Sequence, residues 1–311
     1  MNKNHTLQSN IFKGHQGSIY TLEQMNQGHF LSAAGDGNIV RWNIHDPSSG
    51  LLISKIESGV FCLKYIKDKN LLIAGSGKGN IHFLDLNKQS EIKNIQAHSS
   101  FVFALAVSDN QNSIFSVSAD GHLFKIGLDD YTVVNSKKIA SHKLRDICVL
   151  PDQNKIIVAE ADGCISLIDT ENLNVLDRFQ AHESGFSVYT LCLSEQSGLL
   201  YSGARDAHIN IYAQNNFTIQ DRIPAHNYAI YKLLFNPSGN YLASASRDKH
   251  VKIWDPSSMK VIERINHAQH QGHINSVNTL LWLDDENLLS AGDDRAILHW
   301  NLKTLFTDLR K

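Results

Sequence analysis

The chain lacks several features that would point to particular classes of protein. Its four cysteines include no close pair such as C-x-x-C, so nothing indicates a disulfide framework or a zinc finger. No apolar run approaches the ~18 residues that a membrane-spanning helix needs, and the N-terminus has no apolar segment typical of a signal peptide. Basic and acidic residues nearly balance, 29 against 31, which removes the simplest argument for a nucleic-acid or anionic-membrane partner.

What is present favours a folded, soluble protein. Hydrophobic residues make up 42% of the chain, which is enough to fill a core. Cysteines inside apolar segments are typical of small buried side chains in a reducing compartment. We therefore expect a cytoplasmic monomer with no cofactor, no metal, and no nucleic-acid or membrane partner.

A short phrase recurs along the whole chain. An aspartate stands six residues ahead of a tryptophan in "DGNIVRWN", "DKHVKIWD" and "DRAILHWN", and weaker copies begin at Lys78, Asp120, Asp162 and Asp206. The seven copies start at positions 36, 78, 120, 162, 206, 248 and 294, so successive starts are 42 to 46 residues apart. Because no linker interrupts this spacing, we expect a single domain over residues 1–311.

Each copy contains four short apolar or alternating runs. In residues 226–265 the runs are "AIYKLLF", "YLASAS", "HVKIWD" and "KVIERI", separated by turns rich in Gly, Pro, Asn, Asp and Ser. No segment has a sustained helical period. Four antiparallel strands in a repeat of about 43 residues are the signature of a propeller blade. The sequence predicts an all-β fold, a seven-bladed β-propeller of four-stranded antiparallel blades.

The chain resembles the WD-repeat (WD40) family over residues 5–302. The resemblance depends on the pairs Gly14-His15 and Gly272-His273, on "AH" variants ahead of other copies, and on Trp254-Asp255. It implies that a histidine, serine, aspartate and tryptophan of one repeat form a buried hydrogen-bonded chain. The complete sets are His15, Ser32, Asp36, Trp42; His226, Ser244, Asp248, Trp254; and His273, Ser290, Asp294, Trp300, with His182, Ser202, Asp206 and Tyr212 as a near-complete fourth.

The second, third and fourth copies are degenerate. The fourth keeps His142 and Asp162 but has Val158 and Ile168 at the serine and tryptophan positions. We expect these blades to depend more on apolar packing.

The last repeat is one outer strand short. The N-terminal segment is the only unpaired outer strand, so residues Thr6–Phe12 are expected to complete the seventh blade beside Leu298–Leu302. This pairing, within the N-terminal stretch 1–12, would close the ring and remove the open edges of the sheet. The tail over residues 303–311 has two alternatives, a short helix on the rim or a frayed end.

Three patterns suggest chemistry, and each has a simpler explanation. The recurring His, Ser and Asp resemble a hydrolase triad, but a catalyst needs one activated nucleophile rather than several copies. "HAQHQGH" spaces His267, His270 and His273 as metal ligands would be, although His273 already belongs to the repeat. "GSGKGN" resembles a phosphate loop but lacks the Lys-Ser/Thr ending and a following helix, which favours a hairpin turn.

Two classes of function remain. The resemblance implies a non-enzymatic scaffold that binds a protein or peptide partner at the mouth of the central channel. The alternative is a propeller enzyme, or a propeller that binds a small ligand or metal in the channel, and several carboxylates and histidines lining the channel would favour it.

The expected mouth is rich in aromatic residues. Each innermost strand is expected to begin with an apolar residue, and its neighbour points the other way. In the WD-repeat family that neighbour tends to line the mouth. Arg205 and Arg247 lie on turns at the same end. The neighbours are Tyr20, Phe61, Phe103, Arg145, Tyr189, Tyr231 and Asn278.

Such a collar suggests a partner segment with an aromatic or basic anchor flanked by acidic residues. Packing of some of these rings inside the blades is the alternative.

Overall fold

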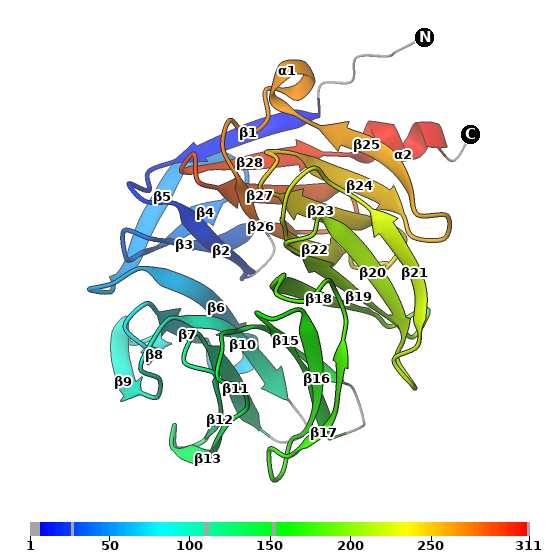
Figure 1. Cartoon of the computed structure of the whole chain (residues 1–311). Coiled ribbons are helices and arrows are strands. Elements are labelled where there is room, and N and C mark those ends of the chain that lie inside the picture. The colour runs from blue at the N-terminus through cyan, green and yellow to red at the C-terminus, as the bar shows by residue number, and fades with distance from the viewer. Residues whose placement is uncertain (1–6, 26–27, 109–111, 151–153, 310–311) are drawn as a thin grey trace.

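The computed structural model describes residues 7–25, 28–108, 112–150 and 154–309. The chain forms seven four-stranded antiparallel sheets arranged as blades in a ring (Figure 1). In blades 1 to 6 the strands follow one another from the inner to the outer edge. Connected antiparallel neighbours of this kind need only short turns.

The first four blades span β2 to β17. Blade 1 consists of β2 (Ile19–Gln24), β3 (His29–Ala34), β4 (Asn38–Asn43) and β5 (Asp46–Lys55). Blade 2 consists of β6 (Val60–Ile66), β7 (Leu71–Ser76), β8 (Asn80–Asp85) and β9 (Ser90–Gln96), with the 3₁₀ turn η1 (Lys67–Lys69). Blade 3 consists of β10 (Val102–Ser108), β11 (Ser113–Ser118), β12 (His122–Gly127) and β13 (Val133–Lys138). Blade 4 consists of β14 (Leu144–Leu150), β15 (Lys155–Glu160), β16 (Cys164–Asp169) and β17 (Val175–Gln180).

The last three blades complete the ring. Blade 5 consists of β18 (Val188–Ser194), β19 (Leu199–Ala204), β20 (His208–Ala213) and β21 (Ile219–Pro224). Blade 6 consists of β22 (Ile230–Phe235), β23 (Leu242–Ser246), β24 (Val251–Asp255) and β25 (Lys260–Ile265), followed by α1 (His267–His270). Blade 7 consists of β26 (Val277–Trp282), β27 (Asn287–Gly292), β28 (Ala296–Asn301) and the N-terminal β1 (Gln8–Lys13), and α2 (Lys303–Leu309) ends the described chain.

The N-terminal strand closes the ring, as the strand count predicts. β1 lies antiparallel to β28, with Phe12 opposite Ile297 and Lys13 opposite Ala296. Phe12 is fully buried and meets Phe30 of blade 1 edge to face, with ring centroids 5.1 Å apart. Thr6 of the expected strand lies outside the described residues. The first and last strands of the described chain therefore join in one sheet, with α2 beyond it on the same side of the ring (Figure 1).

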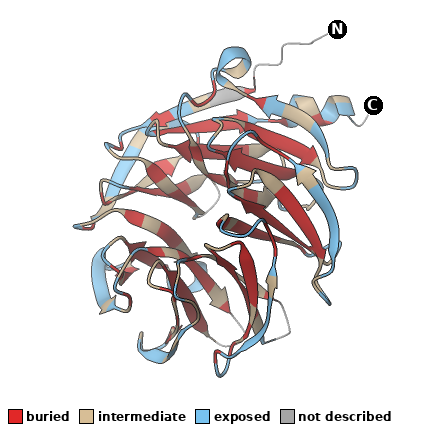
Figure 2. Ribbon diagram, viewed as in Figure 1, coloured by how far each residue is buried: buried red, intermediate tan, exposed pale blue. Residues whose placement is uncertain are grey.

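The hydrophobic core is divided among the interfaces between blades. The buried apolar residues form seven clusters, each shared by two neighbouring blades, and blade 7 shares its clusters with blades 6 and 1. Middle strands such as β7 are buried along their whole length, whereas outer strands such as β17 are mostly exposed (Figure 2). Middle strands packed on both faces become continuous apolar runs, which explains the weak alternation in "LLIAGS" and "KIIVAE".

The C-terminal tail forms a helix rather than a frayed end. The Asn301 side chain accepts from the Lys303 backbone N–H at 3.2 Å, a local turn that leads into α2. Phe306 is buried and stacks on Tyr241 of blade 6, with centroids 3.8 Å apart and planes 6° apart. The helix thus packs against blade 6 beside the closing blade. Neither helix of the described chain has the length and apolar composition that a membrane span requires.

Candidate functional site

A β-bulge at the start of every inner strand positions seven side chains around the central channel. In each blade the pairing between the two innermost strands shifts after the first residue, for example between Ile19 and Thr21 in blade 1. A bulge leaves its extra residue unpaired and redirects its side chain. The seven bulged residues are Tyr20, Phe61, Phe103, Arg145, Tyr189, Tyr231 and Asn278. All seven are half-buried and line the same cavity of about 390 Å³.

Blades 1 to 3 give this mouth an aromatic side. Tyr20 and Phe61 are stacked, with ring centroids 4.6 Å apart and planes 18° apart. Phe61 also meets Phe101 edge to face at 5.0 Å and Phe103 at 6.1 Å. The sequence patterns did not single out Phe101, although it directly precedes the inner strand, and it is 42% exposed. These rings pack against one another across neighbouring blades and remain partly exposed.

Blades 4 to 6 give the mouth a cationic side. The guanidinium of Arg145 lies 4.5 Å from the ring centroid of Phe103 and 5.1 Å from that of Tyr189. Tyr189 in turn meets Tyr231 edge to face at 5.1 Å. The ring faces attract the cation, which holds the long arginine side chain in place. Burial lowers the pKa of Arg145, because the charged form is partly removed from water.

Blade 7 contributes a polar pair at the mouth. Asn278 donates from Nδ2 to Asp293 Oδ1 at 2.8 Å and to the Ile19 carbonyl of blade 1 at 3.1 Å. This second bond links the last inner strand to the first. The carboxylate of Asp293 therefore already has a partner.

The carboxylates deeper in the channel are also engaged in structural contacts. Glu23 lies 3.8 Å from Lys64 and accepts from the backbone N–H of Tyr65 at 3.2 Å. Asp146 accepts from the backbone N–H of Leu191 in the next blade at 2.9 Å. Such contacts join neighbouring inner strands. Both carboxylates therefore have structural partners on neighbouring strands.

The predicted polar chains are present in blades 1, 6 and 7. In blade 6, Trp254 Nε1 donates to Ser244 Oγ at 2.8 Å, Ser244 Oγ lies 2.7 Å from His226 Nε2, and His226 Nδ1 lies 2.9 Å from Asp248. An indole N–H can only donate and a carboxylate can only accept, so the serine hydroxyl donates to Nε2 and Nδ1–H donates to the aspartate. His15, Ser32, Asp36 and Trp42 repeat this geometry, as do His273, Ser290, Asp294 and Trp300.

Burial sets the ionisation of these chains. It lowers the pKa of His226, and this effect exceeds the opposing influence of Asp248. Burial alone would raise the pKa of Asp248, but the bonds from His226 and from backbone N–H groups lower it overall. A neutral histidine and an ionised aspartate are therefore the stable pair. The same chain recurs in three blades, which favours a structural role for these residues over a catalytic one.

Blades 3 and 5 have partial versions of the chain. His182 lies 2.7 Å from Ser202 and 3.1 Å from Asp206, whereas the Tyr212 hydroxyl donates to the Ala181 carbonyl. A phenol hydroxyl projects from the far end of its ring, unlike an indole N–H, and so reaches a different acceptor. Blade 3, expected to be degenerate, keeps a three-member chain of His98, Ser116 and Asp120, with the bonds at 2.8 and 3.2 Å.

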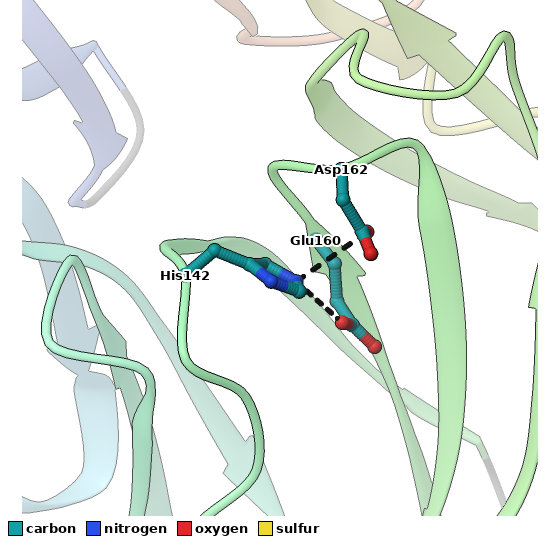
Figure 3. Close-up of side chains that lie close together, drawn as sticks. All are labelled: His142, Glu160 and Asp162. Atoms are coloured by element: carbon teal, nitrogen blue, oxygen red, sulfur yellow. Dashed lines mark hydrogen bonds and ion pairs between the residues drawn. The ribbon is translucent and has the colours of Figure 1, made fainter.

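Blade 4 replaces the chain with a cluster of charged groups. His142 Nε2 lies 2.8 Å from Glu160 Oε2 and 3.4 Å from Asp162 Oδ1 (Figure 3). Glu160 is completely buried and also accepts from Ser166 and Arg178. The sequence patterns did not single out Glu160, Ser166 or Arg178. A carboxylate at the end of the apolar run "KIIVA" was the available signal, because a buried charge needs partners.

This cluster is the one group of three metal-ligating side chains among the described residues. The ligand atoms of His142, Glu160 and Asp162 lie within 4.8 Å of one another. Arg178 donates to both carboxylates, and its bonds to Glu160 raise its own pKa. The guanidinium therefore supplies the positive charge that a metal ion would otherwise provide.

The other suspected sites fall on structural elements. His273 belongs to the polar chain of blade 7, His270 lies 3.8 Å from Glu263, and the His267 ring bonds the Gly272 carbonyl at 2.8 Å. Their ligand atoms do not come together in the structure. The "GSGKGN" stretch, residues Gly75–Asn80, runs from the end of β7 through the turn to the start of β8. There Gly79 has φ 91°, and a Cβ would lie 2.2 Å from the His98 carbonyl oxygen.

Comparisons with known proteins agree with this architecture. The chain matches the family model "WD domain, G-beta repeat" (WD40) over more than half its length, in residues 6–43, 89–124, 173–212, 217–255 and 266–301. Most of blades 2 and 4 lies in the unmatched stretches. Among solved structures, the WD40 beta propeller domain of Doa1 is similar in fold, with a TM-score of 0.83 and 18% identity over 95% of this chain and 96% of that one. No curated protein sequence matches the chain. The chain belongs to the WD40 repeat family.

Proposed function

We propose that the protein is a non-enzymatic interaction scaffold that binds a peptide segment of a partner protein at the mouth of its central channel. WD40 propellers are typically protein-interaction scaffolds. The observation that supports this site most strongly is the set of seven bulges, which place five aromatic side chains around one opening. Half-buried rings of this kind are typical anchors in protein interfaces.

The chemistry of the channel also favours binding over catalysis. Its two carboxylates, Glu23 and Asp146, accept backbone N–H groups from neighbouring strands. All four cysteines are free thiols. Burial raises the pKa of Cys192 to about 11, so its thiol is a poor nucleophile at neutral pH. Free thiols also support a reducing compartment, and we include a cytoplasmic location and a monomeric state in the proposal.

A peptide selection tests the site. A phage-displayed library of random 12-residue peptides would be selected on the folded protein, and the affinity of each enriched peptide measured by fluorescence anisotropy. Phe61→Ala and Tyr231→Ala remove rings on opposite sides of the mouth and are expected to weaken binding at least several-fold. Ile219→Ala, at a position 56% exposed on the outer strand β21, is the matched control.

Folding of each variant would be checked by its melting temperature. Peptides that bind both mouth variants with wild-type affinity, or a selection that enriches nothing, would contradict the proposal and favour the blade rims.

A further inference from the structure

The mouth has two chemically different arcs. In blades 1 to 3 the turn residues that precede the repeat aspartates or lysine are Gly35, Gly77 and Ala119, so the aromatic arc has no charged residue at this position. In blades 5 and 6 the same position holds Arg205 and Arg247, whose backbone N–H groups bond residues at the start of the inner strands, as those of Gly35 and Gly77 do. Blade 4 adds a cation at the bulge position instead.

Each of these three arginines lies over an aromatic ring. Arg145 lines the cavity of the mouth, whereas Arg205 and Arg247 and their rings lie beside it, on the turns and loops at the same end of the inner strands. Arg145 stacks on Phe103 and Tyr189, as described above. The guanidinium of Arg205 lies 5.6 Å from the ring centroid of Phe186, and that of Arg247 lies 5.9 Å from that of Tyr228. A guanidinium stacked on a ring keeps its N–H edges free for an acceptor. An arginine stacked on an aromatic ring thus recurs in the three consecutive blades 4, 5 and 6.

Among the described residues, the three guanidiniums have no anionic partner. No carboxylate of the described residues forms an ion pair with Arg145, Arg205 or Arg247, whereas Arg178 and Arg222 on the outer strands of blades 4 and 5 pair with Asp162 and Asp206. The Nε of Arg145 is buried without a hydrogen-bond partner in the structure. A buried unsatisfied donor is costly, so the hydrogen-bonding capacity of Arg145 is not fully used within the described residues.

The free acceptors of the mouth are correspondingly few. Asp293 is the acidic residue at the turn position of blade 7, and it accepts from Asn278. A basic anchor, one of the two that the sequence analysis allowed, would find one carboxylate there, that of Asp293, whose Oδ1 already accepts from the neutral amide of Asn278. It would also meet three like charges.

We infer that the mouth selects an acidic peptide segment in which an apolar side chain packs on the rings of blades 1 to 3 and neighbouring carboxylates bind Arg145, Arg205 and Arg247. This inference rests on the proposed function, and it names the chemistry of the partner. Planar guanidiniums bind carboxylates through paired N–H···O bonds, which add direction as well as charge. Separation of the two arcs around the ring would also fix the orientation of the bound segment.

Four synthetic peptides test the inference. The parent is a 10-residue peptide in which one Phe precedes three Glu residues, and its counterparts replace the Glu residues by Lys, the Phe by Ala, or one Glu by phosphoserine. Binding would be measured by fluorescence anisotropy at two salt concentrations. We expect the parent to bind at least tenfold more tightly than the Lys and Ala counterparts, and the preference over Lys to shrink at high salt.

Variants of the exposed arginines locate the contact. The double variant Arg205→Gln/Arg247→Gln is expected to weaken the parent peptide at least tenfold, because hydrogen bonds to charged groups are lost. Arg264→Gln is the matched control, since Arg264 is exposed on the outer strand of blade 6. Phe61→Ala removes the ring that contacts the other rings of the aromatic arc, so it tests whether the peptide binds at the mouth.

The outcomes separate the two proposals. Equal or tighter binding of the Lys peptide, still weakened by Phe61→Ala, would overturn the acidic preference while the mouth remains the site. Binding confined to the phosphoserine peptide would overturn the carboxylate assignment. No effect of Phe61→Ala on any peptide would contradict the proposed site as well.

Discussion

The position that a Trp, Ser, His and Asp chain occupies in blades 1, 6 and 7 is occupied by a cluster of charged groups in blade 4. In blades 1, 6 and 7 a chain of indole, hydroxyl and imidazole ends on one aspartate whose side chain is largely buried. In blade 4 the fully buried Glu160 is surrounded by Ser166, His142 and Arg178. Both arrangements leave the blade four-stranded and in register. The polar chain is therefore one way to satisfy buried groups, and the propeller does not require it in every blade.

The three complete chains are also contiguous in the ring. Blade 7, which the N-terminal strand completes, lies between blades 6 and 1. These blades meet at the closure, where the two ends of the chain must pair. A satisfied polar network specifies register more sharply than apolar packing alone. We interpret the presence of complete chains in these three neighbouring blades as stabilising the pairing of β1 with β28.

The largest effect is expected from Trp254→Ala. This change removes a large buried ring and the donor to Ser244, so it should lower the free energy of unfolding by about 3–5 kcal/mol. Ile126→Ala, at the equivalent place in blade 3, removes a fully buried aliphatic side chain and should cost about 2–5 kcal/mol. Chemical denaturation would measure both. A loss below about 1 kcal/mol for Trp254→Ala would show that the chain contributes little.

Glu160→Gln tests the charged alternative in blade 4. It keeps the shape and one acceptor but removes the charge that faces Arg178, so it should cost about 1.5–3 kcal/mol. Glu195→Gln, at an exposed acidic residue that follows β18 in blade 5, is the control. If Glu160→Gln were as stable as wild type, the cluster would contribute no more to the free energy of unfolding than an exposed ion pair does.

Asp248→Asn against Lys78→Asn isolates the repeat aspartate. Asp248 accepts from His226 and from backbone N–H groups, and its replacement should cost about 1–2 kcal/mol. Lys78 occupies the same position in blade 2, where its side chain is 62% exposed, so Lys78→Asn should stay within about 0.5 kcal/mol. Equal effects on the denaturation midpoint would reduce the aspartate to a turn residue.

The smallest expected effect is a loss of stability at acid pH in the blades that contain histidine chains. Burial lowers the pKa values of His15, His98 and His226, so these residues stay neutral in the folded state at a pH where the unfolded chain takes up protons. Their contribution is complete above the unfolded pKa of about 6.5 and is lost as pH falls toward the folded values. The melting temperature of His226→Gln should therefore depend less on pH between 7 and 5 than that of wild type. A parallel dependence would contradict the assignment.

The sequence could predict the ring because its signals are periodic. The recurring Asp-to-Trp phrase predicted seven blades, and the missing outer strand predicted the pairing of β1 with β28. The expected neighbours of the first inner-strand residues all line one cavity. The alternation rule could find them because a bulged residue follows the first apolar residue of the strand, just as a residue on the opposite face of a regular strand would.

The repeat pattern did not reveal contacts that occur in one blade only and join residues far apart in the chain. Arg178 lies 18 residues beyond Glu160 on an outer strand, and the repeat has no charged position there to compare it with. Phe101 precedes its inner strand instead of following its first residue, so the alternation rule passed over it. The stacking of Arg205 and Arg247 on Phe186 and Tyr228 depends on the geometry of adjacent loops, which a single sequence does not encode in any short spacing.

A crystal structure of the protein with a bound, selected peptide would test the central claim most directly. The account predicts that the peptide lies across the channel mouth, with an apolar side chain against Phe61 and a carboxylate within hydrogen-bonding distance of Arg205 or Arg247. A peptide seated on the outer strands or in a groove between blades, with these residues uncovered, would contradict it.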